Sequence, residues 1–431
     1  MSKRWWLLGV GILILVGLLA ACGSKYNSSS NGLLVVASQG SGLLETFSFS
    51  LNSGKVSAIS NTPSDTQNQT CVLNGVPSSI VVAGSYAYAI INANSSCPNS
   101  TTGLESFKLN SDGTITPSGS LVSFNGGAAV VPEMLSVDSA QKFIFVADRA
   151  TTDSNGLALP GGVSVFSIGS GGSVTEVAGS PFSPPSNNAQ FNIDIVSVAA
   201  SPTVFPAIGL NGVQNAVCSA PGNNPPTSEY LYAVDQLGQQ VYEFQVDTST
   251  GALSAPTGQT VVPAFATDQK PSGVAVDPCD RFVYVSNYLA NRISAYTICS
   301  TVIQGTCPAA DGTLLPVSGS PFSLSGNANG PGPLLVDPYG NYVYVVGTKS
   351  NTVSGFKISS ISGSLTALTP AVVATGSQPS SIAIRADDNW MFVSNQNSAS
   401  VSQYSITPAS GALTVQSPIS TDNNPTGVAV K

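Results

Sequence analysis

Histidine is absent from this sequence of 431 residues. Imidazole is the most frequent general base in enzymes and a very common metal ligand. Its absence excludes Ser-His-Asp and Cys-His catalytic arrangements and every metal centre built on imidazole. Any reaction carried out by this chain must therefore move protons with other groups.

Charged residues are also scarce, at 8% of the chain, where about 25% is usual. The 14 Lys and Arg residues are outnumbered by 22 Asp and Glu residues, and the formal net charge is −8. This balance offers no basic surface to a phosphate backbone and excludes nucleic acid as a partner. Helical bundles need many exposed charges, so the low charge, together with 42 Gly and 29 Pro, favours short strands and tight turns.

The N-terminus carries an export signal. Lys3 and Arg4 precede an apolar stretch at 5–19, which is short for a membrane span. The residues that follow, Leu-Ala-Ala-Cys at 19–22, resemble the lipobox of bacterial lipoproteins. This resemblance implies cleavage before Cys22 and acylation of its sulfur and amino group. The alternatives are an ordinary signal peptide and an uncleaved anchor.

We therefore divide the chain into three parts. Residues 1–21 form a signal peptide, residues 22–32 a flexible Ser-rich tether that begins at the lipidated Cys22, and residues 33–431 a folded domain. Several acyl chains on one terminus give a stable membrane anchor. These assignments predict an exported protein of the cell envelope, and an outer-membrane lipoprotein that faces the periplasm or the cell surface.

The rest of the sequence repeats one unit seven times. A complete unit has three β-rich segments and a Gly-x-apolar signal, separated by turn residues, which predicts a four-stranded meander. The third segment of each unit contains an aromatic residue: Phe49, Phe107, Phe166, Phe244, Tyr296, Phe356 and Tyr404. The fourth opens on a glycine: Gly54, Gly113, Gly172, Gly251, Gly312, Gly363 and Gly411. Four strands in units of about 45–70 residues are typical of propeller blades, so we predict an all-β, seven-bladed β-propeller.

The two ends of the chain complete one blade. Residues 425–431 have the pattern of a first strand with no blade after it, and residues 33–38 have the pattern of a second strand with no first strand before it. Joining them removes the unpaired edges that an open ring would expose. We expect the C-terminal strand to close the propeller by pairing with the N-terminal blade.

The clearest unit resembles a known family. Residues 271–296 read Pro-x-x-apolar-x-apolar-Asp-Pro, then Phe-Val-Tyr-Val-x-Asn, then Arg-Ile-Ser-x-Tyr, with weaker copies at 332–358 and 379–406. This pattern resembles the seven-bladed lactonase propellers, which include 6-phosphogluconolactonases of the cycloisomerase-2 type and muconate-lactonizing enzymes. The resemblance covers essentially the whole folded domain, and it implies lactone hydrolysis or lactonizing isomerisation as an activity.

One face of the predicted propeller is the candidate binding side. The loops that join second to third strands, and fourth strands to the next first strands, carry most of the extra length. Second strands end on this face in short polar residues: Asn92, Asp148, Asp235, Asn287 and Asn395. These residues either form a polar ring around a ligand or cap turns.

Catalysis at this face would need a proton carrier and a cation. Glu133 is the candidate carboxylate, and Arg149 and Arg292 are the candidate cations. The resemblance places Arg292 at the family's Arg-apolar-x-x-Tyr position, where a guanidinium would hold a carboxylate or phosphate. The chain departs from many family members, which have His after the first-strand proline; the residues here are Ser78, Glu133, Ser272, Leu334, Ser380 and Thr426.

The pattern of cysteines predicts three disulfides in the exported chain. Six cysteines remain beyond Cys22 and allow 15 pairings, but the repeat register favours Cys71–Cys97, Cys218–Cys279 and Cys299–Cys307. We find neither a Gly-rich phosphate loop nor a spacing of metal ligands, and we predict no cofactor and no metal.

Three functions fit these observations. The first, which we favour, is a lipid-anchored propeller that binds a small molecule, a carbohydrate or a protein at its loop-rich face. The second is a lactone hydrolase or cycloisomerase with a site that lacks histidine. The third is a structural surface protein, for which the exterior rich in Ser, Thr and Asn is suitable.

Overall fold

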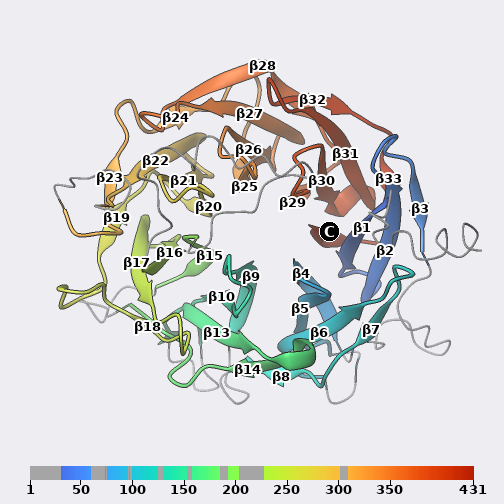
Figure 1. The fold of residues 1–431 in the computed structure, drawn as a ribbon, viewed down its shortest axis with the longest axis horizontal. Coiled ribbons are helices and arrows are strands. Elements are labelled where there is room, and N and C mark those ends of the chain that lie inside the picture. The colour runs from blue at the N-terminus through green and yellow to red at the C-terminus, as the bar shows by residue number, and fades with distance from the viewer. Residues whose placement is uncertain are drawn as a thin grey trace, which may run out of the picture.

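The computed structural model describes residues 31–59, 73, 75–95, 97, 100–124, 130–152, 158–184, 193–202, 228–300 and 309–431. They form seven antiparallel blade sheets around a central axis, each viewed nearly edge-on in Figure 1, and one separate two-stranded sheet. The helices in these ranges are two single turns of 3-10 type, η3 (Ser170–Gly172) and η4 (Gln396–Ser398). No helix in the described part is long and apolar enough to cross a membrane. The predicted seven-bladed β-propeller is confirmed.

The blades are numbered here in chain order, and the first strand of each lies nearest the axis. Blade 1 contains β1 (Asn31–Ser38), β2 (Leu43–Ser50), β3 (Val56–Ala58) and β34 (Pro425–Val430). Blade 2 contains β4 (Val76–Ala83), β5 (Tyr86–Asn92), β6 (Gly103–Leu109), β7 (Ile115–Pro117) and β8 (Val122–Ser123). Blade 3 contains β9 (Val131–Val137), β10 (Phe143–Arg149), β13 (Gly162–Ile168) and β14 (Val174–Glu176), with a small hairpin of β11 (Thr151–Thr152) and β12 (Ala158–Leu159).

The four remaining blades follow the same order. Blade 4 contains β15 (Ile195–Ala200), β16 (Glu229–Asp235), β17 (Gln240–Val246), β18 (Leu253–Ser254) and β19 (Ala264–Ala266). Blade 5 contains β20 (Pro271–Val276), β21 (Phe282–Asn287), β22 (Arg292–Ile298), β23 (Leu314–Pro316) and β24 (Phe322–Ser323). Blade 6 contains β25 (Pro331–Val336), β26 (Tyr342–Gly347), β27 (Thr352–Ile358) and β28 (Leu365–Ala374). Blade 7 contains β29 (Pro379–Ile384), β30 (Trp390–Asn395), β31 (Ser400–Thr407), β32 (Ala412–Val415) and β33 (Ile419–Ser420).

The core lies between neighbouring blades, and the repeated aromatic and glycine residues explain how the blades pack. All seven third-strand aromatics are buried. All seven repeated glycines have a positive φ, which other residues adopt only with strain. A Cβ at Gly411 would lie 2.5 Å from the Tyr342 ring of the preceding blade, so the close approach also requires glycine. The hydroxyl of Tyr344 donates a hydrogen bond to the Gly411 carbonyl at 2.8 Å and joins the two blades.

The ends of the chain close the ring as predicted. Strand β34 pairs antiparallel with β1 from Leu34 opposite Val430 to Ser38 opposite Pro425. Val428 and Ala429 of β34 are buried in this composite blade. The β1–β34 pair therefore covers an edge that would otherwise remain open.

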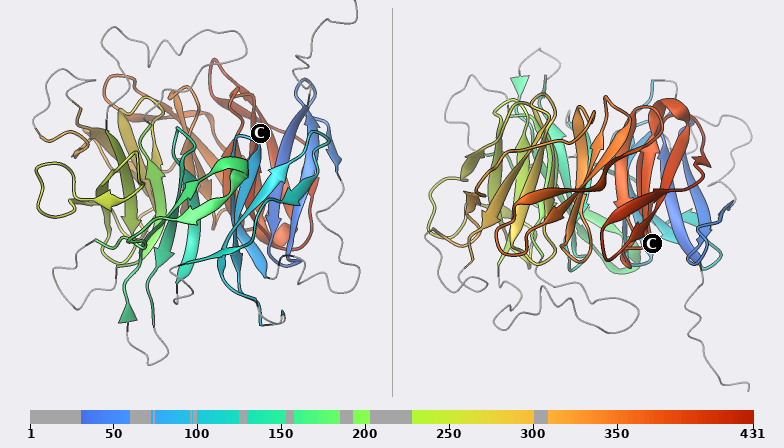
Figure 2. Two further views of the ribbon diagram at one scale, coloured as in Figure 1. Left: turned by 60° about the horizontal axis from the view of Figure 1, so that its bottom comes forward. Right: turned by 90° about the horizontal axis from the view of Figure 1, so that it is seen from above.

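The propeller has two faces, which are distinguished by the direction of the strands. The mouth face is the one at which first strands begin and second strands end, and it includes the β1–β34 end at Ser38 and Pro425. The opposite face, called the anchor face below, contains the turns between first and second strands and the beginning of β1 at Asn31. Figure 2 shows both faces at the ends of the stacked strands.

Candidate active or binding site

Every first strand carries a β-bulge at the mouth face. In five blades one residue of the first strand has no opposite residue on the second strand, and the pairing shifts around it. Blades 2 and 6 have the same shift between Pro77 and Ile80 and between Pro331 and Leu334. Bulges re-aim side chains and often lie beside functional sites. The residues at these positions all line one pocket: Ser78, Glu133, Val196, Ser272, Gly332, Ser380 and Thr426.

The strand pairing corrects one of the residues predicted to follow a first-strand proline. Leu334, which the sequence pattern predicts to follow the first-strand proline, is buried and lines a second cavity together with residues farther along the first strands. Pro331 is opposite Gly347 as Pro271 is opposite Asn287, so Gly332 occupies the ring position in blade 6. The start of this strand contains two prolines, Pro331 and Pro333, and only the strand pairing identifies Pro331 as equivalent to the first-strand prolines of the other blades.

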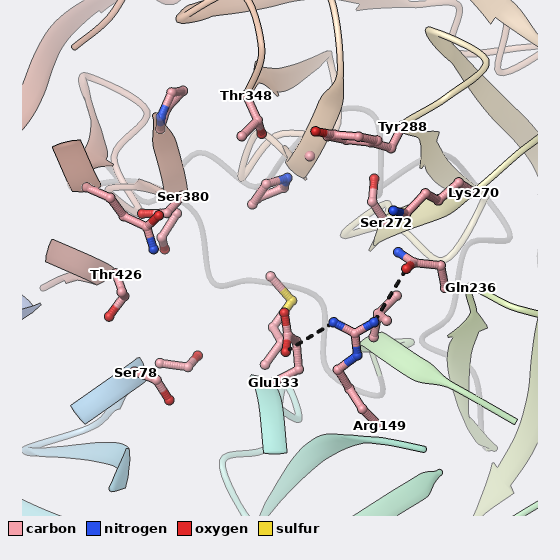
Figure 3. Close-up of a pocket in the computed structure, with 18 residues that line it drawn as sticks. Ser78, Glu133, Arg149, Gln236, Lys270, Ser272, Tyr288, Thr348, Ser380 and Thr426 are labelled. Atoms are coloured by element: carbon pink, nitrogen blue, oxygen red, sulfur yellow. Dashed lines mark hydrogen bonds and ion pairs between the residues drawn. The ribbon is translucent and has the colours of Figure 1, made fainter. Parts of the chain in front are cut away.

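The pocket at the centre of the mouth face has a volume of about 380 Å³. Figure 3 shows hydroxyl groups of several blades, among them Ser78, Ser272, Thr348, Ser380 and Thr426, around this central space. Some of these hydroxyls also connect blades: Ser272 Oγ donates to the Pro331 carbonyl at 2.7 Å, and Ser380 Oγ donates to the Pro425 carbonyl at 3.1 Å. The lining is therefore polar, and hydrogen bonds between neighbouring blades hold these two of its hydroxyl groups in place.

Arg149 is the best-fixed cation of the pocket. It ends β10, and its Nε and Nη2 donate to the two carboxylate oxygens of Asp194 at 3.1 and 2.9 Å. The Asp194 backbone N–H in turn donates to Asp235 at 3.0 Å, and the Ala150 N–H donates to Asp194 at 3.1 Å. The side-chain hydrogen bonds from Arg149 to Asp194 raise the pKa of Arg149 above its ordinary value. Because two of its nitrogens are held in this way, Arg149 presents its remaining Nη1 to the pocket.

Glu133 lies across from this nitrogen and forms an ion pair with it. Its Oε2 is 3.9 Å from Arg149 Nη1, and its side chain retains 47% of its exposure (Figure 3). Partial burial raises the pKa of Glu133, Arg149 opposes the rise, and Asp194 adds to it. The structure thus brings together the predicted carboxylate and one of the two predicted cations.

Arg292, the other predicted cation, is not part of the pocket lining. It begins β22, a third strand, and is separated from the axis by two strands of its own blade. Its half-exposed side chain lies 3.5 Å from Asp268. The residue pattern predicts that Arg292 lies at the mouth end of its strand, as the structure has it. The distance of that strand from the axis, however, is set by the order of strands in the sheet, in which β22 is the third.

The five polar residues predicted to form a ring lie at the ends of second strands, and none of them lines the pocket. Four are buried and bond within the blades: Asp148 accepts from Ser164, Asp235 from the Gly238 N–H, and Asn395 donates to Ser402. Asn287 donates to Ser294. Asn92 donates to Ser78 Oγ at 2.8 Å and so supports a residue that does line the pocket. Their positions match the turn-capping alternative.

The residues that sequence reasoning missed are the immediate neighbours of this ring. In five blades the pocket is lined by the residue that follows the predicted ring residue, or that follows Gly347 in blade 6: Arg149, Gln236, Tyr288, Thr348 and Gln396. Successive side chains of a strand point to opposite sides, so the side chain of one residue is buried within the blade and that of the next residue points to the central pocket. The signal was present in the sequence as a regular offset of one position.

Two lysines accompany Tyr288 at the rim of the pocket. The Nζ atoms of Lys270 and Lys349 lie 5.4 and 4.5 Å from the centre of its ring, within the range of cation–π attraction. Lys270 also lines the pocket. The mouth therefore combines three cations with Glu133.

The disulfide predictions fall partly outside the described residues. Cys97, Cys279 and Cys299 are each disulfide-bonded, but Cys71, Cys218 and Cys307 lie outside the described ranges. The three pairings therefore stay predictions, as does the role of Cys22. Within the described ranges, no group of three or more Cys, Asp and Glu residues is arranged to hold a metal ion.

Comparison with known proteins agrees with this architecture. Residues 223–369 and 300–430 match the family described as "Lactonase, 7-bladed beta-propeller". Over these residues, in the second half of the chain, the sequence is similar to the seven-bladed lactonase propellers. Its sequence matches no curated protein at a significant level.

Several solved structures share the fold of this chain at low sequence identity. A provisionally assigned 6-phosphogluconolactonase from Bacteroides fragilis is 17% identical, with a TM-score of 0.62, 95% of this chain covered and 100% of the other. A periplasmic gluconolactonase from Pseudomonas aeruginosa is 16% identical, with a TM-score of 0.63 and coverage of 93% and 99%. A protein from Lactobacillus plantarum is 14% identical, with a TM-score of 0.65 and the same coverage.

Proposed function

We propose that this protein binds a small, oxygen-rich anion in its mouth pocket, and that a sugar acid or its lactone is the best-matched class. The observation that carries the proposal is the ring of bulged first-strand positions, which surrounds the pocket with hydroxyl groups beside a fixed arginine. Hydroxyl and amide side chains both donate and accept hydrogen bonds, as a polyol ligand requires. Arg149 and Lys270 supply the positive charge for a carboxylate or for a polarised lactone carbonyl.

A second candidate function, lactone hydrolysis, is favoured by the pairing of Glu133 with Arg149. A carboxylate with a raised pKa is suited to take a proton from an attacking water. Arg149 Nη1, on the opposite side of the gap, would stabilise the oxyanion that forms at the lactone carbonyl. The named activity of the Pseudomonas protein supports testing this reaction, whereas identity of 16% carries likeness of fold alone.

The function predicts that Arg149→Lys weakens binding of gluconate by about tenfold or more, the equivalent of about 1.4 kcal/mol. Lysine keeps the charge but loses the planar group that Asp194 holds and aims. Isothermal titration of the purified protein with gluconate, glucono-δ-lactone and neutral glucose measures the effect. Arg292→Lys is the matched control, because Arg292 lies outside the pocket lining and pairs with Asp268, and it should leave the affinity unchanged.

Equal weakening by the two substitutions would contradict the assignment of the pocket. The experiment with glucono-δ-lactone distinguishes the two candidate functions. Binding without turnover identifies a binding protein, whereas saturable hydrolysis that falls by about 10²–10⁴-fold in Glu133→Gln, with folding unchanged, identifies a lactonase. If none of the three compounds binds or reacts, the proposed ligand class is wrong.

We further propose that the protein is anchored in the cell envelope through an acylated Cys22. The support is the lipobox-like sequence at 19–22, which follows a basic and apolar export signal. Labelled palmitate should enter the full-length protein expressed in a bacterial host and should not enter Cys22→Ala. Cys97, which is disulfide-bonded, serves as the matched control, because Cys97→Ala should keep the label. Equal labelling of wild type and Cys22→Ala would show that the anchor lies elsewhere.

A further inference from the structure

We propose that the anchor face of the propeller lies toward the membrane, so that the mouth pocket opens into the aqueous phase on the far side. This inference rests on the proposed acylation of Cys22. It also narrows the source of the ligand: the ligand reaches the pocket from solution, and lipids of the protein's own membrane do not reach the pocket.

The first step of the argument is the position of Asn31. This residue begins β1 and is opposite Ser50, whereas the other end of β1, at Ser38, is opposite Pro425 beside the pocket. Eight antiparallel residues rise by about 24 Å. The chain therefore enters the propeller on the anchor face, about 24 Å from the level of the pocket.

The second step is the length of the tether. Cys22 precedes Asn31 by nine residues, and a fully extended chain spans at most about 3.3–3.6 Å per residue, or about 30 Å here. To bring Cys22 to the mouth face, the tether would first have to pass the two outer strands of blade 1, β2 and β3. At about 4.8 Å per strand, that is about 10 Å before it climbs about 24 Å along the blade. The path exceeds the reach of the tether.

The third step excludes the route through the ring. Strand β34 lies between β1 and the axis, and Val428 of this strand is buried. The tether cannot cross a paired strand without breaking the composite blade. With acyl chains in the bilayer, the anchor face is then the only one of the two that approaches the membrane closely.

Energy transfer from a protein dye to a lipid dye tests this orientation. Two exposed turn residues suit labelling: Ile361, which is 95% exposed between β27 and β28 on the anchor face, and Leu289, which is 53% exposed between β21 and β22 on the mouth face. Each is replaced separately by an azide-bearing amino acid, so that the native cysteines stay intact. The acylated full-length protein is added to vesicles of phosphatidylethanolamine and phosphatidylglycerol that contain a trace of acceptor lipid.

We expect transfer to be several-fold more efficient from position 361 than from position 289. Equal transfer, or stronger transfer from 289, in protein that floats with the vesicles would overturn the orientation and leave the anchor in place. Failure to float with the vesicles would instead show that the anchor itself is wrong, and with it the orientation. Gluconate binding is measured on the same vesicles, and its loss there but not in the Cys22→Ala protein would contradict an outward-facing pocket.

A lengthened tether provides the matched control. Twenty Gly and Ser residues inserted after Asn27 would let the anchor reach either face, because a flexible chain of that composition spans tens of ångströms. The difference between positions 361 and 289 should then shrink. If the difference persists unchanged, the length of the tether does not set the orientation, and the argument from reach is overturned.

Discussion

Deleting residues 426–431 should destroy the cooperative thermal unfolding of the propeller or lower its midpoint by more than 10 °C. The deletion removes most of β34, including the buried Val428 and Ala429, and uncovers β1 along Val35 and Val36, which have no solvent exposure in the closed ring. Each fully buried Val contributes about 1.5–3 kcal/mol, and a domain is stable by only about 5–15 kcal/mol in total. Circular dichroism melting of the purified protein measures the effect.

The control for this deletion keeps the strand and removes one side-chain contact. Thr426→Ala loses a single long hydrogen bond to the Ala37 carbonyl, at 3.3 Å, and should melt within a few degrees of the wild type. A truncated protein that melts at the wild-type midpoint would show that the ring holds together without the β1–β34 pair. Closure by the C-terminal strand would then have no energetic importance.

The propeller should become less stable as the pH rises from 5 to 8.5. Glu229, Glu243 and Asp388 are each at most 1% exposed, and among the described residues at least one carboxylate oxygen of each has no hydrogen-bond partner. Desolvation raises the pKa of all three to about 8. A folded-state pKa above the unfolded value gives stability that is complete below the unfolded pKa and is lost as the pH passes through the folded pKa.

The size of this effect is several kcal/mol, because each tenfold change in a proton-dissociation constant corresponds to about 1.4 kcal/mol. The melting midpoint should therefore fall by about 5 °C or more between pH 5 and pH 8.5. Asp247, whose pKa hydrogen bonds from Ser249 lower to about 2, titrates below this window and does not oppose the trend. Scanning calorimetry over the pH series provides the measurement.

The matched control substitutes the buried acids by amides. Glu243→Gln has the same shape and cannot ionise, so its melting midpoint should depend less on pH than that of the wild type. The substitution Glu133→Gln serves as the comparison, since Glu133 is partly exposed and in the pocket. A midpoint that rises between pH 5 and pH 8.5 would mean that these acids are stabilised in the ionised form, contrary to their environment.

The number of blades and the closure of the ring were determined by the sequence alone. Both follow from local patterns: the aromatic residue in each third strand, the positive-φ glycine before each fourth strand, and the incomplete units at the two ends. Such patterns are readable because the side-chain alternation of strands and the steric freedom of glycine are properties of a short segment. The candidate carboxylate Glu133 and the cation Arg149 were found in the same way, from their places in the repeat.

The composition of the pocket was decided by the tertiary structure. Arg292 and Arg149 both lie at mouth-side ends of strands, yet only the order of strands in each sheet puts Arg149 beside the axis and Arg292 on an outer strand. The bulges in the first strands, and the one-residue offset that selects Tyr288 over Asn287, depend on the pairing between strands. Asp194, the carboxylate that holds Arg149 in place, comes from the neighbouring blade, 45 residues away in the sequence. No local pattern specifies such a partner, because the contact exists only once the ring has closed around its axis.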